Sequence, residues 1–307
     1  MYLVKQRLNP WPYLFIAPYF IIYLIFGFYP ILYSLGISFT NWDGIGSIHF
    51  VGFTNYIKLF TIDPYFWKSI INTLILLLES LPVQIIGGLL LAVALFSKRA
   101  KFKRLFQLVN FLPYITTPVA VGLIFWMFFD WQTGIVNRIL TQSGILAEGI
   151  NWLGNVWPAR IVVGLMIIWK YTGYTMVIYL AGLANIPNDI YEAAYVDGSG
   201  PVHTFFKITV PLLRPVTVFL VITSIIGGLQ LFDEPKLLLA GWGGASGSVV
   251  GGPDRGCLTA VWNLYDTAFG SNMRYGMGAA IAYGLFLVIF LVSIIGAKFL
   301  NRGGDET

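Results

Sequence analysis

Long apolar stretches alternate with short polar loops along this chain, and six stretches are long enough to cross a membrane. About 30 Å of hydrocarbon takes roughly 20 helical residues to cross. The expected spans cover residues 12–37, 69–96, 105–129, 161–184, 216–232 and 275–300. Prolines inside them predict kinks rather than breaks, at Pro18, Pro30, Pro82, Pro113 and Pro118. The pattern predicts an all-α membrane protein with six transmembrane helices.

Composition supports this class. Of the 307 residues, 57% are apolar and only 11% are charged, whereas soluble domains are about one quarter charged. A water-soluble core cannot bury so much apolar surface. We expect a single transmembrane domain over residues 1–307, with a core at about 69–300.

Basic residues predict the orientation. Five of the eight residues at 97–104 are Lys or Arg, and Lys5, Arg7, Lys207 and Lys298 fall on the same side if there are six crossings. The positive-inside rule then places both termini in the cytoplasm. This bias also explains the net charge of +5, so no nucleic-acid partner is expected. The basic, apolar N-terminus is too long for a signal peptide and predicts a retained first helix.

Motifs for chemistry are missing from the loops. The sequence has no G-x-x-x-x-G-K-[ST] phosphate loop, no H-E-x-x-H and no G-x-S-x-G. It has one cysteine, Cys257, and its two histidines, His49 and His203, are far apart. No catalytic residue, metal site or bound cofactor is therefore predicted, and an enzyme is disfavoured.

One polar segment, residues 192–215, interrupts the apolar pattern on the expected cytoplasmic side. A short helix is predicted from Asn188, as a possible N-cap, to Asp197. Gly198 is placed to end it in a left-handed turn, and Pro201 suits the first turn of a second helix. Two short helices joined by a glycine corner predict a docking surface.

The same segment resembles the EAA loop of bacterial ABC-importer permeases. Its fixed positions are occupied by Glu192, Ala193, Ala194, Asp197, Gly198, Phe205, Ile208, Pro211 and Pro215. Further along come Phe232, Asp233, Gly251, Gly252, Pro253, Thr259, Tyr265, Phe269 and a small-residue run at 276–280. This order is similar to the carbohydrate-uptake branch, which includes the maltose and glycerol-phosphate permeases.

The resemblance implies a partnership and a mechanism. Two permease subunits, the second a similar but distinct chain, would sit in the cytoplasmic (inner) membrane above two ATPases that carry ATP and Mg²⁺. A solute-binding protein would deliver a sugar from outside. The coupling loop, at about 185–215, would seat in an ATPase, with Glu192 as the acidic contact, Ala193 and Ala194 allowing close approach, and Asp197 and Gly198 forming the corner. The alternative is a loop that only stabilises the bundle.

Groups suited to a sugar lie in the third to fifth expected spans. Aromatic faces stack on sugar C–H surfaces, and amides and hydroxyls bond sugar oxygens. The set is Tyr114, Thr116, Thr117, Trp169, Tyr171, Thr172, Tyr174, Thr223, Ser224 and Gln230, and Gly227 and Gly228 allow close approach. Tyr171, Tyr174 and Gln230 are the first choices. Taken singly, each aromatic also fits packing or an interfacial belt.

Two charges, Glu79 and Lys170, fall well inside spans. Ionisable groups at such depth are functional candidates. We expect them to pair, in which case neither touches solute. Otherwise Lys170 faces the pathway and favours an anionic saccharide or a glycerol-phosphate-type solute.

Other classes of protein remain as alternatives. An ion-coupled secondary carrier would use Glu79 or Lys170, but the chain lacks the internal repeats common in such carriers. A scaffold without transport would not need the polar, aromatic cluster. The Gly/Ser-rich stretch at 241–250 is either a flexible loop or a contact for the binding protein.

Overall fold

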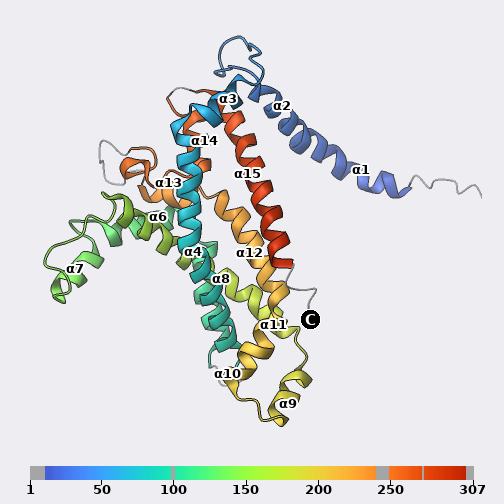
Figure 1. Ribbon diagram of the computed structural model, residues 1–307, viewed down its shortest axis with the longest axis vertical. Helices are drawn as coiled ribbons and strands as arrows, with labels where there is room; N and C mark the ends of the chain where they lie inside the picture. The colour runs from blue at the N-terminus through green and yellow to red at the C-terminus, as the bar shows by residue number, and fades with distance from the viewer. Residues whose placement is uncertain (1–10, 98–100, 240–248, 272, 302–307) are drawn as a thin grey trace, which may run out of the picture. The chain divides into compact units, whose positions relative to one another are not determined.

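The computed structural model describes residues 11–97, 101–239, 249–271 and 273–301, and helices account for most of them (Figure 1). The first part of the chain forms α1 (Trp11–Tyr23), the π-helical turn η1 (Leu24–Phe28), α2 (Tyr29–Ser38), α3 (Thr54–Thr61), α4 (Pro64–Phe96), α5 (Lys103–Ile115), α6 (Pro118–Phe129), α7 (Ile135–Gln142) and α8 (Val156–Ala184). The rest forms α9 (Asn188–Val196), α10 (Pro201–Thr204), the π-helical turn η2 (Phe205–Thr209), α11 (Val210–Leu212), α12 (Arg214–Leu229), α13 (Asp233–Leu239), the 3₁₀ turn η3 (Pro253–Arg255), α14 (Ala260–Phe269) and α15 (Tyr275–Asn301). The Gly/Ser-rich stretch lies mostly outside the described residues.

Within the described part of the chain, four helical stretches are long and apolar enough to cross a membrane, namely Trp11–Ser38, Pro64–Phe96, Val156–Ala184 and Tyr275–Gly296. Two more candidates are bent pairs: Lys103–Ile115 with Pro118–Phe129, at 97°, and Pro201–Leu212 with Arg214–Leu229, at 62°. With each bent pair taken as one span, these six match the six predicted stretches in order.

The expectation of kinks rather than breaks is wrong at Pro118. Thr116 and Thr117 leave the helical region, with ψ of 143° and 136°. A residue before proline is disfavoured in the α region, and proline has no N–H to continue the helix. Helix α5 therefore ends at Ile115, and α6 leaves in a new direction. Pro82, in contrast, lies inside the continuous α4.

The start of α4 shows how the sequence sets a helix boundary. Asp63 has an extended backbone, and its Oδ1 accepts hydrogen bonds from Tyr65 N at 2.7 Å and Phe66 N at 3.0 Å. These bonds satisfy amides that have no partner within the helix. Pro64 occupies the first helical position, where a missing N–H costs nothing.

Contacts divide the chain into two compact units. One comprises residues 63–266 with 285–307. Within it α8 packs against α4, α5 and α12, and α13 packs against α6. A core around Met166 joins α4, α6, α8 and α13, and a second core around Tyr179 joins α4, α8 and α12. This unit holds the cavity described below.

Small residues bring its helices close together. A Cβ built on Gly173 of α8 would overlap the carbonyl oxygen of Asn110 on α5, and one on Gly88 of α4 would press on Thr175 of α8. Close backbone approach at glycine is the usual means by which membrane helices pack. Side chains at these two positions would push the helices apart.

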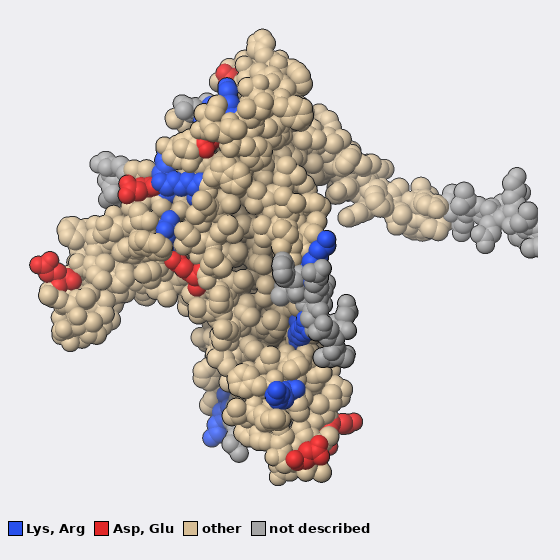
Figure 2. All heavy atoms as spheres, in the orientation of Figure 1, with Lys and Arg blue, Asp and Glu red and all other residues tan. Residues whose placement is uncertain are grey.

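The other unit comprises residues 1–62 with 267–284. Inside it Asn55 Nδ2 donates to Ser38 O at 2.9 Å and to Thr40 O at 2.7 Å, which fixes α3 to the end of α2. None of the residues of α1 is buried. A helix that is apolar on all sides is typical of a membrane span. Uncharged side chains form most of the face seen in Figure 2.

Candidate functional site

A cavity of about 230 Å³ lies among α4, α5, α8 and α12. It is lined by Leu77, Ser80, Leu81, Gln84, Tyr114, Ile167, Tyr171, Tyr174, Thr223, Ser224, Gly227, Gly228 and Leu231. Among these thirteen described residues none carries a charge. The lining is therefore neutral, with aromatic rings, hydroxyls and one amide.

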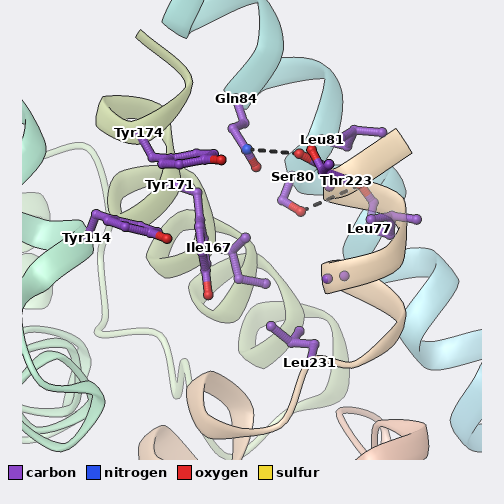
Figure 3. A pocket seen from close by; sticks show the side chains of 13 residues that line it. Leu77, Ser80, Leu81, Gln84, Tyr114, Ile167, Tyr171, Tyr174, Thr223 and Leu231 are labelled. Atoms are coloured by element: carbon purple, nitrogen blue, oxygen red, sulfur yellow. Dashed lines mark hydrogen bonds between the residues drawn. The ribbon is translucent and has the colours of Figure 1, made fainter. Parts of the chain in front are cut away.

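Three tyrosines form one wall of this cavity (Figure 3). The ring of Tyr114 stacks on that of Tyr174 at 4.8 Å between centroids and meets Tyr171 edge-on at 5.9 Å. Because each ring is held by another, the wall presents fixed aromatic surface rather than mobile side chains. Such a surface suits the C–H face of a sugar ring.

Polar groups of α4 and α12 face the cavity from the other side (Figure 3). Gln84 Nε2 donates to Thr175 Oγ1 at 3.0 Å and to Ser224 Oγ at 3.3 Å. Thr223 Oγ1 donates to Phe219 O at 2.8 Å within its own helix. These hydroxyls keep lone pairs that can accept hydrogen bonds from a solute.

Gly227 and Gly228 of α12 have different structural roles. A Cβ on Gly228 would collide with Leu77 of α4, so this glycine lets α12 approach α4. A Cβ on Gly227 would meet nothing within 4 Å. Gly227 therefore leaves space open in the cavity.

Seven of the residues predicted to suit a sugar line this cavity, namely Tyr114, Tyr171, Tyr174, Thr223, Ser224, Gly227 and Gly228. Trp169, Lys170 and Gln230 do not. Trp169 packs on Phe125 at 5.7 Å between ring centroids. Gln230 is the C-cap of α12, and its backbone N–H donates a hydrogen bond to the Gly227 carbonyl oxygen at 3.1 Å.

The expected pairing of Lys170 with Glu79 is wrong. Lys170 Nζ lies 2.7 Å from Glu234 Oε1, and both side chains are buried. Tyr171 donates its hydroxyl proton to the same oxygen at 3.0 Å. Glu234 belongs to α13, in the segment after the fifth predicted span, so it did not stand out as an intramembrane charge.

Glu79 is on α4, and its Oε2 is buried without a hydrogen-bond partner among the described residues. The same oxygen is 3.4 Å from an ideal Cβ on Gly164 of α8. Arg160 of α8 donates hydrogen bonds to Asn72 Oδ1 at 2.7 Å and to Gly256 O at 3.0 Å. Glu79 does not line the cavity.

The glycine-proline segment predicted as a family motif is fixed to α4 and α8 through its carbonyls. Asn72 Nδ2 donates to Arg255 O at 2.8 Å and Leu258 O at 3.1 Å. Gly251 and Gly252 have φ of +87° and +69°, a region that favours glycine.

Burial raises the pKa of the neighbouring Cys257 thiol to about 12.

The predicted docking segment forms two short helices with a glycine corner. Helix α9 begins at Asn188 with Pro187 as its N-cap, so the expectation that Asn188 caps it is wrong. Gly198 has φ of +75°, and α10 begins at Pro201 as predicted. Glu192, Ala193, Asp197 and Gly198 are exposed.

Ala194 differs from its neighbours because it is buried within this chain. Tyr195 and Val196 next to it are each 83% exposed. Of the two alanines, only Ala193 is thus free to face a partner. Two exposed apolar side chains beside an exposed acid form a surface suited to protein contact.

Sequence reasoning missed Ser80, Gln84 and Glu234. Gln84 is a lone amide inside an apolar span, and Ser80 lies one turn before it. A search for polar residues on one face of the second span would have found both. Among the described residues, no group of three or more His, Cys, Asp and Glu side chains could hold a metal ion.

Comparisons with known proteins agree on one family. The family model described as "Binding-protein-dependent transport system inner membrane component" matches residues 66–302. The lactose transport system permease protein LacF of Rhizobium radiobacter is 35% identical over 94% of this chain and 92% of its own length. The arabinooligosaccharides transport system permease protein AraP of Bacillus subtilis (strain 168) is 37% identical over 94% of this chain and 87% of its own.

A solved structure shares the fold. A chain from the crystal structure of a bacterial ABC transporter involved in the import of the acidic polysaccharide alginate aligns with a TM-score of 0.78. The alignment covers 95% of this chain and 96% of that one, at 24% sequence identity. At this identity the likeness supports the fold.

Proposed function

This chain belongs to the family of binding-protein-dependent transport system inner membrane components, and we propose that it is a permease subunit of an ATP-driven importer for a neutral sugar or short oligosaccharide. It is a transport component rather than an enzyme, as its family membership establishes. The resemblance to ABC-importer permeases noted in the sequence is confirmed by that membership.

The neutral, tyrosine-walled cavity is the observation that carries the choice of solute. It offers stacking surface on one side and amide and hydroxyl groups on the other. Ligand sites of this kind combine aromatic area with a few polar groups that fix orientation. Relatives named for lactose and arabinooligosaccharides support the same class.

The proposed assembly contains a second, similar permease, two cytoplasmic ATPases that bind ATP and Mg²⁺, and an external solute-binding protein. Both termini of this chain lie in the cytoplasm in this proposal, and residues 192–215 face an ATPase. The exposed Glu192 and the left-handed corner at Gly198 support such a docking surface. ATP-driven closure of the ATPases would tilt the permeases and open the cavity to alternate sides.

A second candidate solute is an anionic saccharide or a glycerol-phosphate-type compound. Lys170 favours it, since its Nζ is 5.3 Å from the centre of the Tyr171 ring that lines the cavity. Glu234 offsets that charge at 2.7 Å, so the neutral solute is preferred. An ion-coupled secondary carrier lacks support from the family match.

Co-purification from the native membrane followed by mass spectrometry tests the proposal. The expected companions are a second permease, an ATPase with a phosphate-binding loop and a binding protein that carries a neutral sugar. A chain that purifies alone and transports solute in ATP-free, proton-loaded vesicles would contradict it.

A further inference from the structure

A buried ion pair lies directly behind the cavity wall. Lys170 of α8 and Glu234 of α13 are joined at 2.7 Å, with side-chain exposures of 8% and 4%. Removal of two charges from water is costly, and such a pair often adds little to stability compared with apolar residues. The pair is therefore a candidate for a functional role.

Tyr171 connects this pair to the cavity. Its ring lines the space, while its hydroxyl donates to Glu234 Oε1 at 3.0 Å (Figure 3 shows the ring). The same oxygen accepts from Lys170 Nζ. One carboxylate oxygen thus orients a wall residue and neutralises a cation at the same time.

The ion pair is close enough to the wall to affect the electrostatic potential in the cavity. None of the described lining residues is charged, so the potential in the cavity depends on charges just behind the wall. At an effective dielectric constant of about 20, an unbalanced charge several ångströms from a charged solute changes the affinity for that solute by roughly tenfold or more. A lining without a positive charge offers no countercharge to offset the desolvation of an anion.

We propose that Glu234 is a specificity-determining residue, which masks the charge of Lys170 and holds Tyr171 so that the cavity accepts neutral saccharides and excludes anionic ones. The inference rests on the proposed transport function. Without Glu234, Lys170 would make the cavity electropositive. Without Lys170, Glu234 would make it electronegative.

The first test measures the potential in the cavity and needs no knowledge of the sugar. Thr223→Cys places a thiol on the wall opposite the tyrosines, where the native hydroxyl bonds only its own helix at Phe219 O and Leu220 O. The chain's single native cysteine, Cys257, is buried. The readout, in the assembled transporter, is the ratio of labelling rates for a sulfonate and a trimethylammonium methanethiosulfonate.

In this background Glu234→Gln is expected to raise the ratio of anionic to cationic labelling roughly tenfold or more. Lys170→Met should lower it by a similar factor. The double variant should return close to the starting ratio, since both charges are gone. Tyr171→Phe is the matched control, because it removes a hydrogen bond to Glu234 and leaves the ion pair.

A single variant with an unpaired buried charge can fail to assemble, so Glu234→Asp is a second probe. It keeps the charge but shortens the reach to Lys170, and it should give a ratio between those of the parent and Glu234→Gln. Equal ratios in the parent and in every variant that assembles would overturn the masking role.

The second test compares solutes. Uptake of maltotriose and of trigalacturonate, each at equal concentration, is measured in proteoliposomes of the complete transporter. Glu234→Gln should shift the preference toward the anion roughly tenfold, and the double variant should lose that shift. An unchanged preference would overturn the specificity role.

The two tests separate failure of this inference from failure of the proposed function. Labelling ratios that shift as expected, with no ATP-driven uptake by the parent of any saccharide that its binding protein carries, would preserve the masking of Lys170 and contradict a saccharide cavity. Sugar uptake with constant labelling ratios would preserve the saccharide cavity and contradict the masking of Lys170.

Discussion

The side-chain amide of Gln84 on α4 donates a hydrogen bond to the hydroxyl of Thr175 on α8, across 3.0 Å. A second bond from the same nitrogen reaches Ser224 on α12 at 3.3 Å. One side chain thus ties together three helices that line the cavity. Polar contacts between membrane helices are each worth about 0.6 kcal/mol.

Gln84→Leu should therefore destabilise the assembled transporter by about 1 kcal/mol and weaken solute binding. We expect a lower midpoint of thermal unfolding and a KM for sugar uptake that rises severalfold. Thr172→Val is the control, because the Thr172 hydroxyl bonds Ile168 O in its own helix. If Gln84→Leu leaves the KM unchanged, Gln84 stabilises the helices but does not contribute to solute binding.

Gly173→Ala should disrupt the packing of α5 on α8. The new Cβ would overlap the Asn110 carbonyl, which is backbone and cannot rotate away. Overpacking of this kind costs about 1–3 kcal/mol, measured as a lower midpoint of thermal unfolding. Gly296→Ala in α15 is the matched control, since its Cβ would meet nothing within 4 Å. Equal stability of the two variants would contradict the close contact.

Glu192→Lys should uncouple transport from ATP hydrolysis, because it reverses the charge of the exposed acid on α9. Uptake is expected to fall roughly tenfold or more if a charge-assisted contact to the ATPase is lost. The amount of permease in the membrane should stay the same. Asp189→Lys makes the same charge change on the same helix and should have a smaller effect. Normal uptake by the Glu192→Lys variant would contradict the proposed role of Glu192 in coupling.

Cys257 should resist thiol reagents in the folded protein. It is completely buried, and burial raises its pKa to about 12, so almost no thiolate forms near pH 8. Incubation with N-ethylmaleimide at pH 8 should leave the thiol unmodified, as mass spectrometry would report, until a denaturant is added. Rapid modification of the native transporter would show that the segment around Cys257 opens.

The sequence predicted those features that depend on local pattern. Apolar length located six spans, and turn chemistry located the corner at Gly198. Tyr171 and Tyr174 were found because aromatic faces and hydroxyl groups that suit a sugar cluster in the third to fifth predicted spans. These inferences need only residue type and spacing.

Features that depend on tertiary contacts could not be read in this way. Lys170 and Glu234 are 64 positions apart, and Glu234 lies in a short helix after a span. Glu79 also falls well inside a predicted span, yet Lys170 pairs with Glu234 instead. Pro118 breaks its span while Pro82 does not, and the sequence offers no simple rule that separates the two.

ATP-driven sugar uptake by the Gly227→Trp variant tests the central claim most directly. Gly227 lines the cavity and has free space around its Cβ, so an indole at this position should fill the cavity without disturbing the helices. The assay uses proteoliposomes of the whole transporter, with ATP inside and the loaded binding protein outside, and Gly296→Trp as the control. We predict that Gly227→Trp abolishes uptake while Gly296→Trp retains it. Uptake by Gly227→Trp at the rate of the parent would contradict a solute path through this cavity.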